Sequence, residues 1–480
     1  MPGSASSRLV DPVRTLLVSM VLVEVTSGFT QQYLSPLLPG IGVRSGITSA
    51  QISWIYVVQT VSMAVLTPML SRLGDSHGYR RILRLSVGMV TVGSLLMALW
   101  PTLPLLLLGA VLQGGVVGFM PLMIGILRNR AGDEASRRGI GILVGALLLA
   151  TGFGGIVAGV FGASDARHGL WVGVAAGVLG LVACVVMPDA DTRPSAERFS
   201  MTAFGLLTVG LAGVVLALSQ GSAWGWTSAA TLLSGAVGLA ALALWPYAEL
   251  RTDRPMVDVR VFRNRRIAVL SVVTFFLAFS TLGSIVVNAT FLAADPASGG
   301  YGFGLDSDAI GWALLAFIAA GIAASSLTPF ALRRIGDRAT LLAGGVATAI
   351  GFAGLALAHD DLTVFLILTA FNGIGLGVFE SATRALSVEA VPQDDTAIAA
   401  GINELVLSLG AAVGAAALSA ALAAHSDVTG HVATGGYTTG WWMCCAGGVL
   451  AGISALLLRR QSLLPGTEVP APVPQPTSSY

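Results

Sequence analysis

The sequence lacks lysine altogether and carries few charges of either sign. All 26 basic residues are arginine, and charged residues make up only 11% of the 480 residues, against 54% hydrophobic residues. A soluble globule of this composition could not cover its surface with polar side chains. The composition therefore excludes a soluble protein and predicts a chain embedded in a lipid bilayer. Because no basic run resembles a nucleic-acid-binding patch, we expect no nucleic-acid partner.

Cysteine is equally scarce, with three residues in the chain. Cys184, Cys444 and Cys445 all fall within apolar stretches, where they indicate packing rather than a disulfide framework or a metal site. The chain also has no G-x-x-x-x-G-K-[ST] segment that could hold the phosphates of ATP. We therefore expect no metal and no cofactor. Residues 1–13 show no cleavable-signal pattern, so the first apolar stretch is interpreted as a retained helix.

Long apolar stretches dominate what is present. About 20 apolar residues in a helix cross the roughly 30 Å core of a bilayer, and none of the stretches shows the period-two alternation of a barrel strand. We expect fourteen transmembrane helices. They are predicted at 15–38, 50–70, 82–100, 104–126, 139–163, 169–187, 201–220, 228–247, 268–293, 309–331, 339–358, 361–382, 397–424 and 437–458.

The distribution of arginine tests this count. If the N-terminus is cytoplasmic, the predicted outer loops contain only Arg44 and Arg167, and the other 24 arginines lie in tails, inner loops or cytoplasmic helix ends. One helix more or fewer would invert every later loop and destroy the asymmetry. The positive-inside rule therefore predicts a multi-pass protein of the cell membrane with both termini in the cytoplasm.

A weak internal repeat divides the chain. I-S-W at 52–54 and R-L-G-D at 72–75 are matched by I-G-W at 310–312 and R-I-G-D at 334–337, offset by 258 residues at the tryptophans and by 262 at the aspartates. Repeats of this kind are a recurrent transporter design. The expected parts are a cytoplasmic tail (1–14), a six-helix bundle (15–187), two inserted helices (201–247), a second six-helix bundle (268–458) and a disordered Pro-rich tail (461–480).

The loop after the second predicted helix carries a family resemblance. S-R-L-G-D-S-H-G-Y-R-R-I-L, from Ser71 to Leu83, resembles the signature loop G-x-L-a-D-r-x-G-r-k-x-x-l of the major facilitator superfamily, with Ser71 where glycine is usual. The resemblance implies the all-α membrane fold of that family. It also implies a cytoplasmic gating loop, whose residues here are Asp75, Gly78, Arg80, Arg81 and Arg84.

Fourteen helices resemble the drug:proton antiporter branch of that family, in which two central helices are added. Leu37–Ile41, Gln113–Gly114 and Val391–Asn403 are similar to further motifs of the branch. Other positions depart from it. Ala110 stands where an intramembrane arginine is usual, Thr30 stands where an acidic residue is common, and Ala150–Thr151 replace a Gly-Pro pair. The usual machinery for proton transfer is therefore missing or has moved.

Ionisable groups within predicted spans are the first candidates for transport, because burying a charge in lipid is costly. Glu24 and Glu404 are predicted to couple protons or to bind substrate, since a buried carboxylate without a cationic partner is expected to be protonated much of the time. Glu380 has an alternative interpretation as an interfacial residue paired with Arg384. The candidates for lining a cavity are Ser27, Gln31, Gln32, Ser35, Tyr56, Gln59, Asn403, Ser408 and Glu380, and the amides and hydroxyls among them could equally hydrogen-bond between helices.

The sequence thus predicts a monomeric secondary transporter that exports hydrophobic or amphipathic small molecules in exchange for protons. An importer or facilitator of a specific solute is the alternative, because the antiporter motif is only partly present. A membrane-embedded enzyme would need a cluster of His, Asp, Ser or Cys at one cavity, and the sequence indicates none.

Overall fold

The structure is a computed structural model of the chain. It describes residues 7–34, 37–38, 41, 45–47, 49–130, 133–162, 165–187, 200–251, 264–296, 301–305, 307–392, 396–425 and 432–458. These residues are almost entirely helical. The predicted tail 461–480 and most of the arginine-rich stretch from Arg251 to Arg266 lie outside them.

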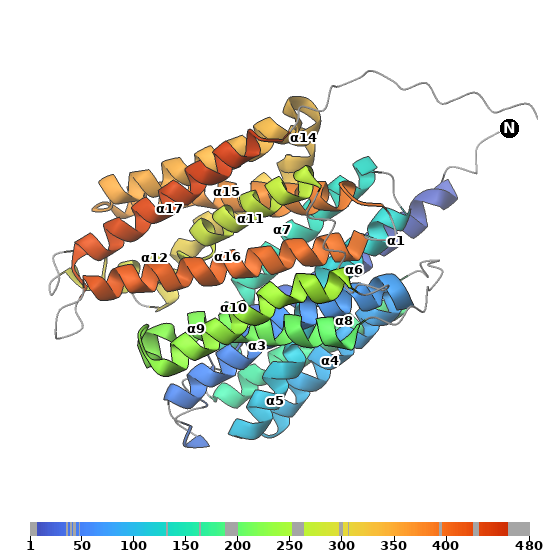
Figure 1. Ribbon diagram of the computed structural model, residues 1–480, viewed down its shortest axis with the longest axis horizontal. Helices are drawn as coiled ribbons and strands as arrows, with labels where there is room; N and C mark the ends of the chain where they lie inside the picture. Colours follow the sequence, from blue (N-terminus) through green and yellow to red (C-terminus); the bar gives the residue numbers. More distant parts are fainter. Residues whose placement is uncertain are drawn as a thin grey trace, which may run out of the picture.

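The helices form two halves joined by a hairpin (Figure 1). The N-half contains α1 (Ser7–Gln32), α3 (Ser49–His77), α4 (Tyr79–Leu99), α5 (Leu103–Gln113), η1 (Gly114–Gly118), α6 (Phe119–Arg130), α7 (Asp133–Gly162) and α8 (Ala166–Val186). The hairpin consists of α9 (Met201–Trp224) and α10 (Ala229–Leu250). The C-half contains α11 (Arg265–Thr281), α12 (Ile285–Ala293), α14 (Ser307–Leu357), α15 (Leu362–Glu389), α16 (Thr396–Ala424) and α17 (Thr434–Ala455).

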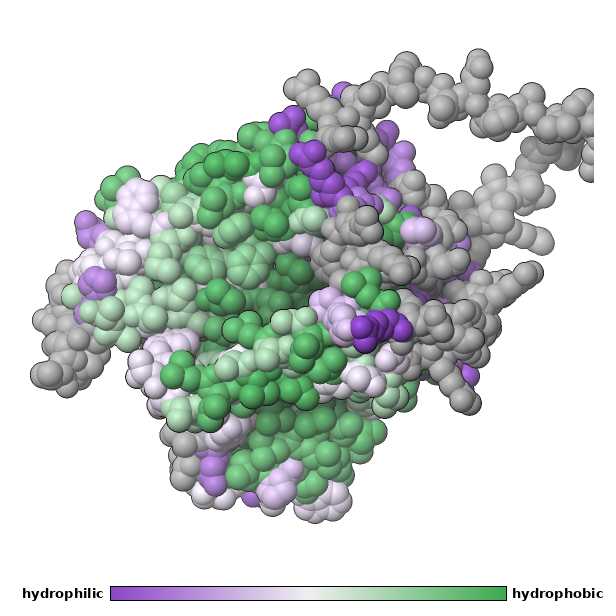
Figure 2. Space-filling model, in the orientation of Figure 1, coloured by the Kyte–Doolittle hydropathy of each residue, from purple (hydrophilic) through white to green (hydrophobic). Residues whose placement is uncertain are grey.

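Each of the fourteen predicted stretches contains helix, so the expectation of an all-helical fold is confirmed. Within the described residues, ten helical stretches are long and apolar enough to cross a membrane by length and composition. Figure 2 shows hydrophobic residues covering the flanks of the helices in this view, with the strongly hydrophilic residues gathered toward the ends. Fourteen crossings remain a prediction.

Several helix boundaries differ from those predicted. The first helix begins at Ser7 rather than at residue 15, within the expected tail. The stretch 268–293 is two helices, because the chain leaves regular α-helix between Thr281 and Ile285. The stretch 104–126 contains the 3₁₀ segment η1. The stretches 309–331 and 339–358 both lie in α14, but the non-helical backbone at Gly336 separates them into two helices, as predicted.

Two glycines with positive φ mark equivalent turns in the two halves. Gly78, between α3 and α4, has φ 96°, and Gly336 of α14 has φ 82° and ψ 167°. They lie 258 residues apart, which is the offset of Trp54 and Trp312 and not the 262 of the two aspartates. The two halves of the repeat are therefore aligned on these turns. Asp75 precedes its turn and Asp337 follows its turn, so the two aspartates are not equivalent.

Among the described residues, the largest buried cluster joins the two halves near one end of the molecule. It runs from N-half residues such as Leu83 and Leu127 into C-half residues such as Ala385 and Ala400. This cluster lies at the end of the molecule that we call the arginine-rich end, because it also carries Arg80, Arg84, Arg128 and Arg137. At the opposite end, the N-half cluster around Tyr33 and the C-half cluster around Phe291 are separate. The described residues thus form a bundle that is closed at the arginine-rich end.

The turn at Gly336 gives a prediction about stability. Its φ and ψ fall in a region that is essentially restricted to glycine, so Gly336→Ala should destabilise the protein by about 1–3 kcal/mol. A Cβ at Gly336 would meet nothing within 4 Å, so the cost is backbone strain rather than a clash. Thermal unfolding of the purified protein in detergent should show a lower Tm.

Gly88 provides the matched control. A Cβ added there would also meet nothing within 4 Å, but Gly88 lies within α4 with an ordinary helical backbone. Gly88→Ala should therefore leave the Tm unchanged or raise it slightly. Equal effects of the two substitutions would contradict the assignment of strain to Gly336.

Candidate functional site

Three charged side chains form a buried ion-paired group in the C-half. Arg384 of α15 is 2% exposed and donates from Nε to Glu404 Oε1 of α16 at 2.5 Å and from Nη2 to Glu404 Oε2 at 3.1 Å. Its Nη1 donates to the carboxylate of Glu380, one turn earlier in α15. The guanidinium thus bridges two helices and two carboxylates, the planar geometry for which arginine is suited.

This group corrects three sequence interpretations. The sequence predicts Arg384 at a helix end, but α15 continues to Glu389 and Arg384 lies within it, so the chain does contain a buried arginine between helices. Glu404 is expected to lack a cationic partner and has one. Glu380 is 4% exposed and not interfacial, although its predicted pairing with Arg384 is confirmed.

A signal for the longer helix is present in the sequence. Ala385, Leu386 and Val388 continue the apolar pattern beyond Arg384, and helices commonly end shortly before a proline, here Pro392. The predicted helix ends at residue 382 because an arginine is normally interpreted as the end of a span. The i, i+4 spacing of Glu380 and Arg384 shows why that interpretation fails: a paired arginine can remain inside.

Glu24 is the fourth member of the site and comes from the N-half. It lies in α1, is 1% exposed, and neither of its carboxylate oxygens has a hydrogen-bond partner among the residues that the structure describes. It is nevertheless close enough to Arg384, Glu404 and Glu380 for its charge to interact with theirs. We call Glu24, Glu380, Arg384 and Glu404 the charge cluster.

The charge cluster contains one guanidinium and three carboxyl groups. Since two carboxylates already occupy Arg384, an ionised Glu24 would add an uncompensated negative charge in a buried place. A neutral, protonated Glu24 avoids that cost. The arrangement can therefore bind and release a proton at Glu24, with Arg384 as a cation whose charge acts on it.

The polar candidates on α1 and α3 fall into different surroundings. Gln31 donates to Ser27 at 3.1 Å, and both Gln31 and Gln32 are exposed, so their lining of a cavity stays a prediction. Gln59 instead donates to Gln113 at 3.2 Å, in a buried network that also includes Tyr33. Gln59 thus belongs to interhelical packing. Tyr56 is half-buried, and Ser35 lies outside the described residues.

On α16, Asn403 and Ser408 flank the charge cluster. Asn403 accepts from Thr274 of α11 at 3.0 Å, while its side-chain nitrogen has no partner among the described residues. Ser408 is half-buried and donates to the carbonyl of Glu404 at 2.9 Å. Within the described part of the chain, the amide of Asn403 is thus an unused donor beside the charge cluster.

The signature loop closes the arginine-rich end by contacting the C-half. Asp75 accepts hydrogen bonds from the backbone N–H groups of Ala397 and Ile398, at 3.3 and 3.1 Å, at the start of α16. A carboxylate at a helix N-terminus is stabilised by the helix dipole and by the unpaired N–H groups. Tyr79 donates to Asp75 at 2.7 Å and holds the carboxylate in place. This contact ties α3 of one half to α16 of the other.

The remaining arginines of that loop bind within the N-half. Arg80 donates to the carbonyl of Val185 and Arg84 to that of Cys184, so both bind the C-terminal end of α8. Arg81 is exposed, and Gly78 provides the turn into α4. Of the predicted gating residues, Asp75 therefore makes the contact between the halves.

Two arginines of the N-half that the sequence analysis does not single out also bridge the halves, and Arg333 of α14 does so from the C-half by pairing with Glu134 of α7. Arg128 of α6 donates to the carbonyl of Val391 at 2.8 Å and to Thr396 Oγ1 at 3.0 Å, which are both in the C-half. Arg137 of α7 forms a two-point ion pair with Glu389, at 2.5 and 2.7 Å. These arginines differ from others at the same end by contacting the opposite half. Such a contact is a tertiary property that no local sequence pattern encodes.

Comparison with known proteins gives a consistent result. The family model described as Major Facilitator Superfamily matches residues 20–295 and 268–479. The Multidrug resistance protein Stp of Mycobacterium tuberculosis is 25% identical over 82% of this chain and 72% of its own. The Tetracenomycin C resistance and export protein of Streptomyces glaucescens is 24% identical (78% and 70%), and the Quinolone resistance protein NorB of Staphylococcus aureus is 22% identical (92% and 95%).

Solved structures show the same fold. The human organic anion transporter MFSD10 (TETRAN) matches with a TM-score of 0.66 at 15% identity, over 92% of this chain and 99% of its own. The proton:xylose symporter XylE matches with a TM-score of 0.64 at 12% identity, over 92% and 95%. The major facilitator fold expected from the signature loop is thereby confirmed.

The charge cluster gives a prediction about stability. Arg384→Gln leaves Glu380 and Glu404 buried without their cation, so we expect the protein to lose about 3–5 kcal/mol of stability. Replacing all three with Glu380→Gln, Arg384→Gln and Glu404→Gln should restore much of the loss, because neutral amides can hydrogen-bond with each other. Thermal unfolding in detergent measures both effects.

An exposed ion pair serves as the control. Arg138 and Glu134 are paired with side chains 64% and 55% exposed. Arg138→Gln should cost only about 0–1 kcal/mol. If Arg384→Gln were as mild as Arg138→Gln, the buried ion-paired group would not have the energetic role assigned to it.

Proposed function

Because the chain belongs to the major facilitator superfamily, we propose that it exports hydrophobic or amphipathic small molecules by proton antiport with alternating access. The names of its relatives support the substrate class: they refer to multidrug, quinolone and tetracenomycin C resistance. Membership of a family of transporters supports a carrier.

The observation that carries the proposal is the buried carboxyl group of Glu24, which has no hydrogen-bond partner among the described residues and lies near an arginine that already holds two other carboxylates. When Glu24 is protonated, Arg384 remains with Glu380 and Glu404. When Glu24 loses its proton, a third carboxylate competes for the same guanidinium. Since Glu24 belongs to the N-half and Arg384 to the C-half, proton release changes the attraction between the halves, which is what coupling requires.

Alternating access also needs a closure that can be broken. At the arginine-rich end the halves meet through separable polar contacts, such as Asp75 with the start of α16 and Arg137 with Glu389. The positive-inside rule favours this end as the cytoplasmic one. The described form is then closed to the cytoplasm, with substrate contacts expected around Gln31, Gln32 and Asn403. The driving force is ample, at roughly 2.3 kcal/mol per charge for each 100 mV.

Substitution of the two acidic candidates tests the coupling. Glu24→Gln mimics a permanently protonated group, so proteoliposomes should lose pH-driven transport by at least about tenfold while still binding substrate. Glu404→Gln leaves Arg384 with Glu380 and frees the guanidinium for Glu24, so it should weaken coupling while substrate binding remains. Both variants should be assayed in a defined pH gradient, with Asp360→Asn, whose side chain is 95% exposed, as the control. Retention of full coupling in both variants would exclude these residues as the proton site.

Export itself is tested in cells. Expression should raise resistance to several lipophilic compounds and lower their accumulation, and Glu24→Gln should abolish both effects at equal protein level. A broad panel that shows neither effect would contradict export of such compounds. Counterflow and gradient-reversal assays in proteoliposomes separate an exporter from an importer or facilitator, the second candidate, which the partly missing antiporter motif favours.

A further inference from the structure

The α9–α10 hairpin runs along the N-half over most of its length. Near the start of α9, Leu207 lines a cavity together with Pro68 and Ser71 of α3. At its other end, Trp224 lies against Trp54 of α3, with ring centroids 6.0 Å apart. The hairpin is therefore attached to α3 both at the arginine-rich end and at the opposite end.

The hairpin also contacts the C-half, but at the arginine-rich end. A buried cluster there joins α3, α9 and α16, and residues of α10 pack against it (Figure 1). Its members from α16, including those packed against it, are Ile398, Ile402, Leu405 and Val406. These fall within the first eleven residues of a 29-residue helix. α9 thus covers the line along which α3 and α16 meet, at the end where the molecule is closed.

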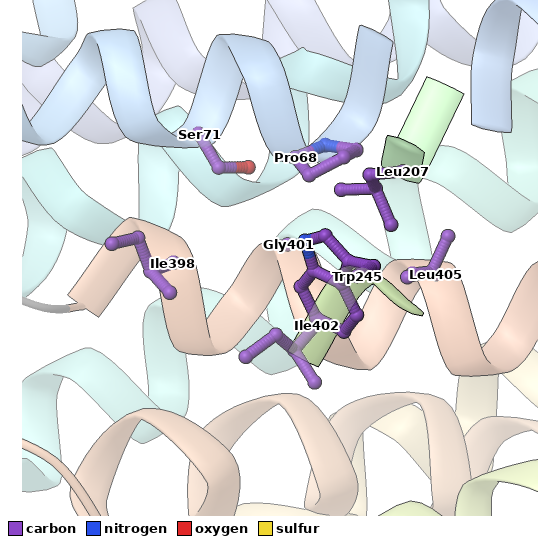
Figure 3. A pocket seen from close by; sticks show the side chains of 8 residues that line it. All are labelled: Pro68, Ser71, Leu207, Trp245, Ile398, Gly401, Ile402 and Leu405. Atoms are coloured by element: carbon purple, nitrogen blue, oxygen red, sulfur yellow. The ribbon is translucent and has the colours of Figure 1, made fainter. Parts of the chain in front are cut away.

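Trp245 of α10 is the largest side chain at this junction. Its indole lies against α16 beside Gly401 and Ile402 (Figure 3). Its Nε1 donates to Glu249 Oε1 at 3.1 Å, and Glu249 is 2% exposed, so the ring has a fixed orientation. At this junction α3 and α16 are in close contact, because a Cβ at Gly401 would lie 2.3 Å from Ser71 Oγ.

The junction is not fully packed. A cavity of about 60 Å³ remains between the hairpin and the two helices, lined by Pro68, Ser71, Leu207, Trp245, Ile398, Gly401, Ile402 and Leu405 (Figure 3). Its walls are almost entirely apolar, and the hydroxyl of Ser71 donates to the carbonyl of Thr67. An unfilled apolar cavity weakens the contact around it, since the lining atoms lack partners on one side.

We propose that the α9–α10 hairpin moves with the N-half as one body and acts as a releasable brace, holding α16 against α3 only while the arginine-rich end is closed. The proposal rests on alternating access as the proposed function. The contact along the length of α3 keeps the hairpin in place. The short, imperfectly packed contact with α16 breaks when that end opens, and its strength shifts the balance between the two forms.

Cysteine labelling measures that balance without any transport assay. Ser136 is 4% exposed and lies at the closure beside Arg128 and Glu389, so Ser136→Cys reports opening of that end through its reactivity with a maleimide. In purified protein in lipid nanodiscs, with the native Cys184, Cys444 and Cys445 replaced by alanine, Trp245→Ala should raise the labelling rate on the order of tenfold, because it removes a packed aromatic side chain from the closed form. Leu405→Phe fills the cavity and should lower the rate several-fold.

Leu233→Ala is the matched control, since Leu233 lies on α10 but is 64% exposed and faces away from the junction. It should leave the labelling rate unchanged. Equal rates in the Trp245→Ala and Leu233→Ala proteins would overturn the brace. These rates report conformation alone, so a failure of the proposed export would not affect them.

Spin-label distances test whether the hairpin moves with the N-half. A label on Leu233 is paired either with Val92 of α4 or with Ile350 of α14, all of them exposed positions. In the Arg137→Gln protein at the same pH, which loses the ion pair with Glu389 that closes the arginine-rich end, the distance to Val92 should stay constant and the distance to Ile350 should change. A hairpin that keeps its distance to Ile350 instead, or to both positions, would refute the proposal.

Discussion

The ion-paired group of Arg384 with Glu380 and Glu404 is the interaction on which the proposed mechanism depends. A guanidinium in this position is tolerated only with anionic partners, and both partners come from the C-half. The C-half thus supplies both anions, and its group of one guanidinium and two ionised carboxylates already has a formal charge of −1. An ionised Glu24 of the N-half would add to this negative charge, so the charge state of Glu24 becomes the variable quantity in the site.

The hydrophobic packing also differs between the two ends of the molecule. The cluster around Tyr33 in the N-half and the cluster around Phe291 in the C-half are separate, whereas buried clusters near the arginine-rich end contain residues of both halves. Polar contacts such as Asp75 with the start of α16 lie over these shared clusters. A buried apolar contact and a set of hydrogen bonds thus close the same end, and both must be lost together when it opens. This agrees with an all-or-none change between two forms, because packed cores are not continuously deformable.

The sequence is sufficient to predict the helices, the family and the position of Glu24, because hydropathy and motif spacing are local properties. It places Glu404 in the site but misjudges its charge environment. Whether Arg384 is a flanking residue or a buried partner depends on which face of α15 meets α16, and that is a tertiary property. The closure by Arg128 and Arg137 escapes prediction for the same reason. The repeat is recognisable, but its alignment requires the backbone at Gly78 and Gly336.

The 3₁₀ segment η1, between α5 and α6, has a consequence for how the N-half faces the C-half. A 3₁₀ helix turns by about 120° per residue and an α-helix by about 100°, so five residues add roughly 100° of rotation. Side chains after Gly118 therefore point about a quarter-turn away from the direction that an unbroken α-helix would give them. Arg128 reaches Val391 from this rotated register. A helical wheel continued from residue 104 to residue 128 as one α-helix would place Arg128 on a different face, and conversion of Gly114–Gly118 to α-helix would rotate Arg128 out of contact with Val391.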